Sequence, residues 1–336
     1  MPTRREFLCA AAGAPLALQA RSERRNCIVI VLNGGASQLD TWDPKPDTPS
    51  EIRGPFRAIR TNVAGIRISE IFPRMAKCAD RYTLIRSVYS DAGPHSHEEA
   101  LRPIDEATRE FTALSGLRNL TRACDLIESG VRQIRVDMYD TIFHQPTWDS
   151  HGVRPFSTIR DYPDTVAPAF DLGFTRLLEN LRRSGLFDST LVVALSEFGR
   201  GPKINPMGGR DHWPYCQTVI VAGGGTEGGQ IAGSSDAIGA EPKDNPLSLS
   251  ALLASIFQSP STNHPKGRSR LSQVSGGNAP QPQPRSRSHT RQAATEPLVC
   301  GLPFAALRQS PQMPGARTIP RFGHYGILRS DRRQTS

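Results

Sequence analysis

Five apolar, β-branched runs that alternate with amphipathic stretches constrain the fold of this chain more than any other feature. They comprise residues 27–33, 82–88, 131–139, 190–196 and 217–223. The runs are short and apolar on both faces, which is typical of strands that are covered on two sides. Ser69 as a helix N-cap predicts a helix over 69–78, and apolar residues at helical spacing predict helices over 112–129 and 168–184, the last ended by Gly185. The alternation predicts an α/β fold: a three-layer α/β/α sandwich around a mostly parallel sheet.

Polar side chains that could carry chemistry follow the predicted strands. Asp149 and His151 come after strand 131–139, Glu197 follows strand 190–196, and Asp211 and His212 stand in the loop before strand 217–223. In such sheets, ligands bind beyond the carboxyl ends of the strands. Carboxylates and imidazoles from several strand ends suit a divalent metal, most simply Zn²⁺, because they leave one position open. Each pair alone is more typical of a turn, so the prediction depends on both lying at one sheet edge.

The charge of the chain is unevenly distributed. The net charge of +9 over 336 residues would ordinarily favour a nucleic acid or an anionic membrane as partner. Residues 259–336 hold twelve basic and two acidic side chains, and the first 26 hold five and two. Residues 27–258 hold 24 basic and 28 acidic side chains, a net charge of −4. We therefore expect no nucleic-acid partner for the folded part, although a basic nucleic-acid-binding arm is the alternative interpretation of the tail.

Three parts are predicted along the chain: an export signal over 1–26, one α/β domain over 27–258, and a disordered, basic Ser/Pro/Arg-rich tail over 259–336. The start contains Thr3-Arg4-Arg5-Glu6-Phe7-Leu8 before a short apolar run, and it resembles a twin-arginine export signal. The alternative is a disordered basic start. The apolar run is too short to span a membrane. The predicted location is periplasmic or extracellular. A shifted reading frame is a further interpretation of the tail.

Six cysteines are widely spread, with no metal-binding spacing between them. Isolated buried thiols are the prediction, and a disulfide within one set of four stays open in an oxidising compartment. That set is Cys27, Cys78, Cys124 and Cys216.

Five blocks, read in order after the twin-arginine-like start, carry a family resemblance. They are VLNGGASQLDTWDPKP, GIRISEIFPRMAKCADRYTLIRSV, GVRQIRVDMYDTIFHQPTWDSHG, STLVVALSEFGRGPKINPMGGRDHWP and GSSDAIGAEPKD. The chain resembles the exported, sulfatase-like domain-of-unknown-function family 1501, which is placed in the alkaline phosphatase superfamily. The resemblance implies an alkaline phosphatase-like sandwich and a metal-dependent esterase site. Compared with the family, the chain is shortened in the middle and has an atypical tail.

The resemblance also implies roles for particular residues. Asp149, His151 and His212 stand where the superfamily binds its first metal. Glu197-Phe198 stands where active members have an Asp-His pair for a second metal, and a phenylalanine cannot ligate. Asn33 replaces an acidic ligand, for which Asp40 or Asp43 could substitute. Ser96, within the block Gly93-Pro94-His95-Ser96-His97, is the candidate nucleophile, and the alternative for that block is an exposed polar loop.

Two functions stay open on these observations. The first is an exported metal-dependent hydrolase of small-molecule or polymer phosphate or sulfate esters, with catalytic candidates Ser96 and Glu197 and metal-ligand candidates Asp149, His151, His212, Glu197 and Asp211. The second is a non-catalytic binding module on the same scaffold. The sequence lacks the C/S-x-P-x-R context of formylglycine sulfatases, a phosphate-binding P-loop and a G-x-S-x-G elbow. Oligomeric state is left open.

Overall fold

A central mixed sheet organises the structure, a computed structural model that describes residues 26–90, 97–116 and 118–257. The strand order is β11-β4-β10-β7-β1-β6-β5, and β14 pairs with β4. The strands are β1 (Asn26–Val31), β4 (Tyr82–Tyr89), β5 (Thr112–Ser115), β6 (Gln133–Asp137), β7 (Thr190–Leu195), β10 (Gln217–Gly223), β11 (Gln230–Ala232) and β14 (Leu247–Ser248). All five predicted strands are present, with β6 shorter than expected.

Most strand pairs in the sheet are parallel. β1 pairs in parallel with both β6 and β7, and β5 continues that half beyond β6. β10 is antiparallel to its two neighbours, β7 and β4. The start of β10 therefore lies at the same edge as the ends of β1, β6 and β7. A residue placed just before β10 can thus meet residues placed just after the other three strands.

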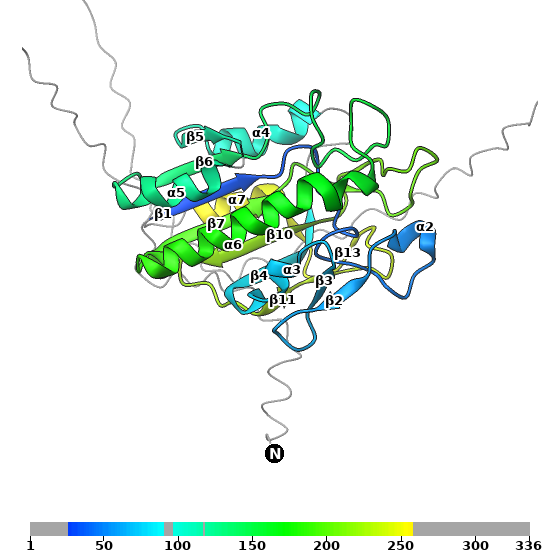
Figure 1. Cartoon of the computed structure of the whole chain (residues 1–336), viewed down its shortest axis with the longest axis horizontal. Coiled ribbons are helices and arrows are strands. Elements are labelled where there is room, and N and C mark those ends of the chain that lie inside the picture. Colours follow the sequence, from blue (N-terminus) through cyan, green and yellow to red (C-terminus); the bar gives the residue numbers. More distant parts are fainter. Residues whose placement is uncertain (1–25, 91–96, 117, 258–336) are drawn as a thin grey trace, which may run out of the picture. The chain divides into compact units, whose positions relative to one another are not determined.

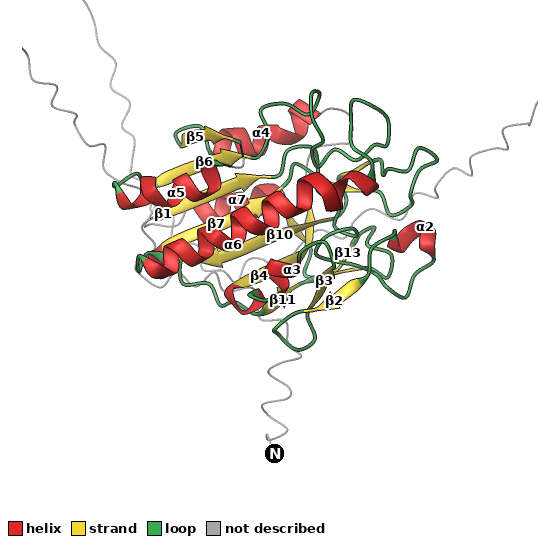
Figure 2. Ribbon diagram, in the orientation of Figure 1, coloured by secondary structure: helices red, strands yellow, loops and turns green. Residues whose placement is uncertain are grey.

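Helices cover both faces of the sheet (Figures 1 and 2). On one face, side chains such as Ile28 and Val192 pack with Phe170 and Leu120 of the covering helices. On the other face, Val29 and its neighbours pack against α4 and α7. The principal helices are α3 (Pro73–Ala76), α4 (His97–Ala107), α5 (Asn119–Glu128), α6 (Ala167–Arg183) and α7 (Leu249–Phe257). The predicted three-layer α/β architecture is confirmed.

Short elements connect these layers. They are α2 (Ser50–Arg53), β2 (Ala58–Arg60), β3 (Arg67–Ser69), β8 (Gly199–Arg200), β9 (His212–Trp213), β12 (Ser234–Ser235) and β13 (Pro242–Asp244), with 3₁₀ turns at Ala79–Arg81, Ile159–Asp161 and Phe187–Ser189 and one π turn at Tyr162–Val166. β8 and β9 form a two-stranded ribbon beside the edge that carries the polar residues. None of the helices in the described ranges has the length and apolar character that crossing a bilayer requires.

Two predicted helices were wrong in their bounds. The expected helix over 69–78 is reduced to α3, because Ser69 ends strand β3 and Pro73 occupies the first helical position. The carboxylate of Asp171 fixes this start by accepting hydrogen bonds from the backbone N–H groups of Arg74 (2.9 Å) and Met75 (2.7 Å). The N-cap interpretation of Ser69 is therefore wrong, since this residue ends a strand and the helix begins four residues later.

The expected helix over 112–129 divides into β5 and α5. Gly116, with φ of 91°, separates the two, since a positive φ interrupts a helix at little cost only for glycine. Residues 112–115 pair with β6 in place of continuing the helix. By contrast, the predicted helix over 168–184 agrees with α6 to within a residue, and Gly185 follows it with φ of 69°.

The thiols follow the simpler prediction. The four cysteines of the described residues are buried, and none of them forms a disulfide bond. Burial raises the pKa of Cys78 to about 11 and that of Cys216 to about 12, so both thiols stay protonated at neutral pH. The predicted export signal and tail lie outside the described residues, except for Asn26 at the start of β1.

Candidate metal centre

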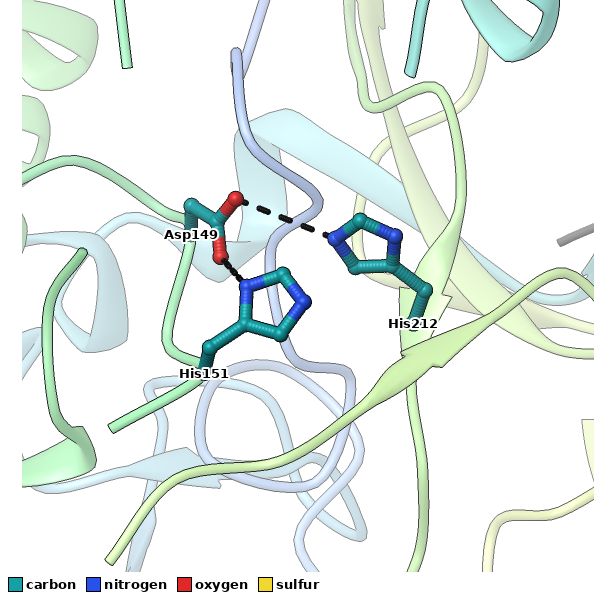
Figure 3. Close-up of side chains that lie close together, drawn as sticks. All are labelled: Asp149, His151 and His212. Carbon is teal, nitrogen blue, oxygen red and sulfur yellow. Dashed lines mark hydrogen bonds and ion pairs between the residues drawn. The ribbon is translucent and has the colours of Figure 1, made fainter. Parts of the chain in front are cut away.

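Asp149, His151 and His212 come together at the edge formed by the ends of β1, β6 and β7 (Figure 3). Each offers one ligand atom, and these atoms all lie within 4.8 Å of one another. Asp149 is fully buried, whereas the side chains of His151 and His212 are 29% and 21% exposed. The site is therefore accessible from one side, where two imidazoles face solvent above a buried carboxylate.

The loop that carries Asp149 and His151 is closed by its own hydrogen bonds. The backbone N–H of Thr147 donates to Oγ of Ser157 (2.9 Å), and that hydroxyl donates back to the carbonyl of Thr147 (2.9 Å). The N–H of Ser157 donates to the carbonyl of Asp149 (2.8 Å), and the N–H of Gly152 donates to that of Ser157 (2.8 Å). The two ligand candidates are thus held on a compact loop after β6.

His212 reaches the same point on the ribbon of β8 and β9. Arg200 and His212 are directly opposite each other in this ribbon, and opposed residues project their side chains to the same face. Both side chains lie against Asp149: Nη2 of Arg200 is 2.8 Å from Oδ1, and Nε2 of His212 is 3.8 Å from Oδ2. The ribbon therefore supplies one ligand candidate and one fixed cation to the same carboxylate.

Arg200 was not identified from the sequence, yet it is the most heavily bonded side chain of the site. It is fully buried, and besides Asp149 it donates from Nε to the carbonyl of Gly35 (2.9 Å) and from Nη1 to that of Arg210 (2.9 Å). It also donates from Nη2 to the carbonyl of Gly34. One guanidinium thus joins the loop after β1, the Asp149 loop and the ribbon.

The electrostatics of Asp149 follow from these contacts. Burial acts to raise the pKa of its carboxyl, but the hydrogen bond with His151, the adjacent His212 and the charge of Arg200 outweigh burial. The pKa of Asp149 is held well below its ordinary value, so the group is a carboxylate. Burial, assisted by the charges of Arg200 and His151, lowers the pKa of His212, which favours the neutral imidazole that metals bind.

The donor set fits a metal ion. Oδ2 of Asp149 and Nε2 of His212 are both buried, and neither has a hydrogen-bond partner among the described residues. Such orphaned polar atoms are costly unless something pairs them. Neighbouring ligand atoms of a tetrahedral Zn²⁺ lie about 3.3 Å apart, given bonds of about 2.0 Å. The observed 3.8 Å separation is close to that spacing.

Two glycines permit the close approach of the segments around Asp149. A Cβ atom on Gly34 would lie 2.4 Å from the backbone nitrogen of Asp149, and one on Gly209 would lie 2.1 Å from the carbonyl oxygen of Ser150. The loop containing Gly209 is also tied to the His151 loop by Asn205, whose Nδ2 donates to the carbonyl of His151 (2.9 Å). These glycines therefore allow the loop that carries Asp149 and His151 to pack against the loop after β1 and the segment before β9.

Glu197 and Asp211 are not brought into the ligand group. Glu197 is fully buried after β7, and its Oε1 accepts a hydrogen bond from the N–H of Gly34 (2.7 Å). Asp211 is exposed, and its Oδ1 accepts from Nδ2 of Asn205 (3.0 Å). Through this hydrogen bond, Glu197 holds the loop after β1. Ser96, the candidate nucleophile, lies outside the described residues.

A second metal position is not formed by the described residues named for it. Phe198 is buried, its ring is 4.2 Å from that of His212, and a Cβ atom on Gly35 would meet it at 2.5 Å. The three polar candidates nearby pair with other side chains. Asn33 donates to Asp137 (3.2 Å). Asp40 pairs with Arg210 (2.6 Å), and Asp43 pairs with Arg86 (3.3 Å).

The fold and the site together define an α/β protein with an Asp-His-His group that could hold a metal ion at the carboxyl edge of the sheet. The sequence model of the family described as "Protein of unknown function (DUF1501)" matches residues 24–110 and 104–273. The chain belongs to this family. The two matched pieces overlap at residues 104–110, which include the end of α4. No curated protein matches the chain.

Solved structures with a similar fold include a protein in the alkaline phosphatase superfamily from Vibrio parahaemolyticus, at 8% identity, with 67% of this chain and 68% of that chain covered and a TM-score of 0.36. The zinc complex of the C-terminal periplasmic domain of EcEptC from Escherichia coli is similar at 10% identity, over 74% and 86%, with a TM-score of 0.39. The lipoteichoic acid synthase LtaP from Listeria monocytogenes is similar at 8% identity, over 75% and 76%, with a TM-score of 0.35. At such identities the similarity concerns the fold and not the function.

Proposed function

We propose that the protein is an exported, metal-dependent hydrolase of phosphate or sulfate esters with one divalent metal, most simply Zn²⁺. The observation that carries the proposal is the pair of orphaned, buried ligand atoms on Asp149 and His212, beside His151. Three protein ligands with one side open to solvent are the arrangement of catalytic rather than structural zinc sites. The chemistry that such a metal supplies is polarisation of an ester oxygen.

Residues of this chain set the charge of the site and the orientation of its ligands. Asp149 supplies one negative charge and the two histidines supply none while neutral, so a divalent cation keeps a net positive charge and attracts an anionic ester. Arg200 keeps Asp149 ionised and oriented by holding Oδ1, which leaves Oδ2 directed toward His212. Glu197 holds Gly34, whose backbone lies against Asp149. Ser96 is proposed as the nucleophile on the family resemblance alone.

The alternative is a non-catalytic module that binds the metal or an anion. Phe198 against His212, and the engagement of Asn33, Asp40 and Asp43 elsewhere, favour it, because these described residues do not supply ligands for a second metal. The two functions differ in turnover and not in metal content.

Elemental analysis and turnover of the purified protein test both proposals. We expect about one equivalent of divalent metal per chain, turnover of aryl phosphate or aryl sulfate, loss of turnover after chelation and recovery with Zn²⁺. A Ser96→Ala variant with normal metal content and no turnover would support the nucleophile. Bound metal without turnover of either ester would favour the module, and absence of stoichiometric metal would refute the hydrolase.

We propose export by the twin-arginine route on the basis of Arg4, Arg5, Phe7 and Leu8. The export machinery recognises the arginine pair, so lysine at both positions is expected to prevent export and leave the chain in the cytoplasm of a bacterial host. Fractionation of cells that express the two forms measures this. Equal export of the unchanged chain and of the Arg4→Lys/Arg5→Lys variant would contradict the proposal.

A further inference from the structure

Large apolar side chains are exposed beside the metal centre. Phe143 is 53% exposed, Val153 is 46% exposed and Met207 is 57% exposed. Phe143 follows β6 in the segment that leads to Asp149, and Val153 lies two residues after His151. Exposed apolar side chains are ordinary when scattered, but a group at the mouth of a polar site is characteristic of ligand binding.

Ring contacts connect this surface to the metal-ligand candidates. The ring of Phe143 lies 5.9 Å from that of Phe156, and Phe156 lies 5.0 Å from the ring of His151. The ring of His151 is in turn 4.2 Å from that of His212. A chain of ring contacts therefore runs from the partly exposed imidazoles through Phe156 to the exposed Phe143.

The loop that carries Met207 is held against the same segment. A Cβ atom on Gly152 would lie 2.5 Å from the carbonyl oxygen of Met207, so the two backbones touch. The amide of Asn205 fixes this loop by accepting hydrogen bonds from the N–H groups of Met207 (3.0 Å) and Gly209 (3.0 Å). The surface is therefore built on fixed backbone, as a preformed binding site requires.

The size and surroundings of this surface indicate its occupant. A few side chains offer far less area than the roughly 1,000 Å² that a stable protein interface needs. They are enough for one face of a six-membered ring. Exposed polar side chains, His144 and Gln145, follow Phe143 in the chain, so a ring with polar edges could also be accommodated.

We propose that Phe143 and Phe156, flanked by Val153 and Met207, form a subsite for the ring face of the alcohol part of the ester. This inference rests on the proposed function, because the ester group must sit at the Asp-His-His centre. The shared chemistry is an apolar ring face, supplied either by the flat face of an aryl group or by the C–H face of a sugar ring. Stacking on an aromatic side chain would hold the ring while the anionic group faces the metal.

Binding of non-hydrolysable phosphonates to the full, zinc-loaded chain tests the subsite without turnover. Isothermal titration calorimetry would compare phenylphosphonate, methylphosphonate and the isosteric phosphonate of glucose 6-phosphate. Phe143→Ala is expected to weaken phenylphosphonate binding about 3- to 10-fold and to leave methylphosphonate binding unchanged. The matched control is Ile231→Ala. Ile231 is an exposed apolar side chain (37%) on β11, the first strand in the strand order, and its replacement should change the binding of neither phosphonate.

The outcomes separate the two proposals. Selective weakening of phenylphosphonate supports an aryl ring, and selective weakening of the sugar phosphonate supports a sugar ring. The subsite is refuted if Phe143→Ala weakens the binding of no ring-bearing phosphonate, or if it weakens methylphosphonate binding equally. Neither result contradicts the proposed metal centre. If methylphosphonate binds equally well with and without zinc, the proposed function fails and the subsite with it.

Discussion

Replacement of His212 by alanine is expected to lower the affinity for a divalent metal by more than about 100-fold and to abolish turnover. The loss of a ligand should lower the metal affinity by more than the 10- to 100-fold that is typical when a residue that only orients a ligand is lost. The variant should remain folded, because His212 is partly exposed and its Nε2 has no hydrogen-bond partner among the described residues. Equilibrium dialysis with Zn²⁺, followed by elemental analysis, measures the change.

A matched control is His144→Ala, which removes an exposed histidine outside the ligand group. It should retain the metal affinity of the unchanged protein. A thermal shift on adding Zn²⁺ should occur in this control and in the unchanged protein but not in the His212→Ala variant, since binding to the native state stabilises it. Equal zinc affinity in both variants would show that His212 is not a metal ligand, and it would contradict the proposal of a single-metal hydrolase.

Replacement of Arg200 by methionine is expected to destabilise the protein by about 3–5 kcal/mol, which is the usual cost of removing one partner of a buried ion pair. The change leaves Asp149 charged and buried, and it leaves the carbonyls of Gly34, Gly35 and Arg210 without their donor. Urea denaturation measures the free energy of unfolding. The metal affinity of the folded fraction should also fall, by about 10- to 100-fold.

Arg57→Met is the control for Arg200→Met. Arg57 is 86% exposed in an ion pair with Glu70, so its loss should change the free energy of unfolding by less than about 1 kcal/mol. A further variant, Arg200→Met/Asp149→Asn, should recover part of the lost stability, because it removes the unpaired buried charge. The role assigned to Arg200 would be contradicted if its replacement cost no more than that of Arg57.

The sheet was predictable from the sequence because its strands are apolar on both faces and short. The runs over 27–33 and 190–196 correspond to β1 and β7, which pair along their full length. The helices were less predictable where local signals overlapped. At 112–129 an apolar spacing suited both a helix and a strand, and pairing with β6, a long-range event, decided the first four residues.

The candidate site was predictable only in its ligand types. Asp149, His151 and His212 are donors that a metal prefers, and they stand next to recognisable strands. Arg200 was missed because nothing local marks a buried arginine. The signal beside it was Gly199, where a Cβ atom would lie 2.0 Å from the carbonyl oxygen of Cys216. Glu197 has the right chemistry for a ligand, but its direction is set by the N–H of Gly34, 163 residues away.

The two buried arginines have a consequence for how the site opens. Arg200 joins the loop after β1 to the Asp149 loop, while Arg210 binds Asp40 and the carbonyl of Ile52. Loops at a sheet edge usually exchange their amide hydrogens through local fluctuations. Here Arg200 and Arg210 each bind more than one of these segments, so opening one segment would break bonds that also hold another. We therefore expect the loops around Asp149 to open as one cooperative unit in native-state hydrogen exchange, with amides protected nearly as well as those of the sheet beneath.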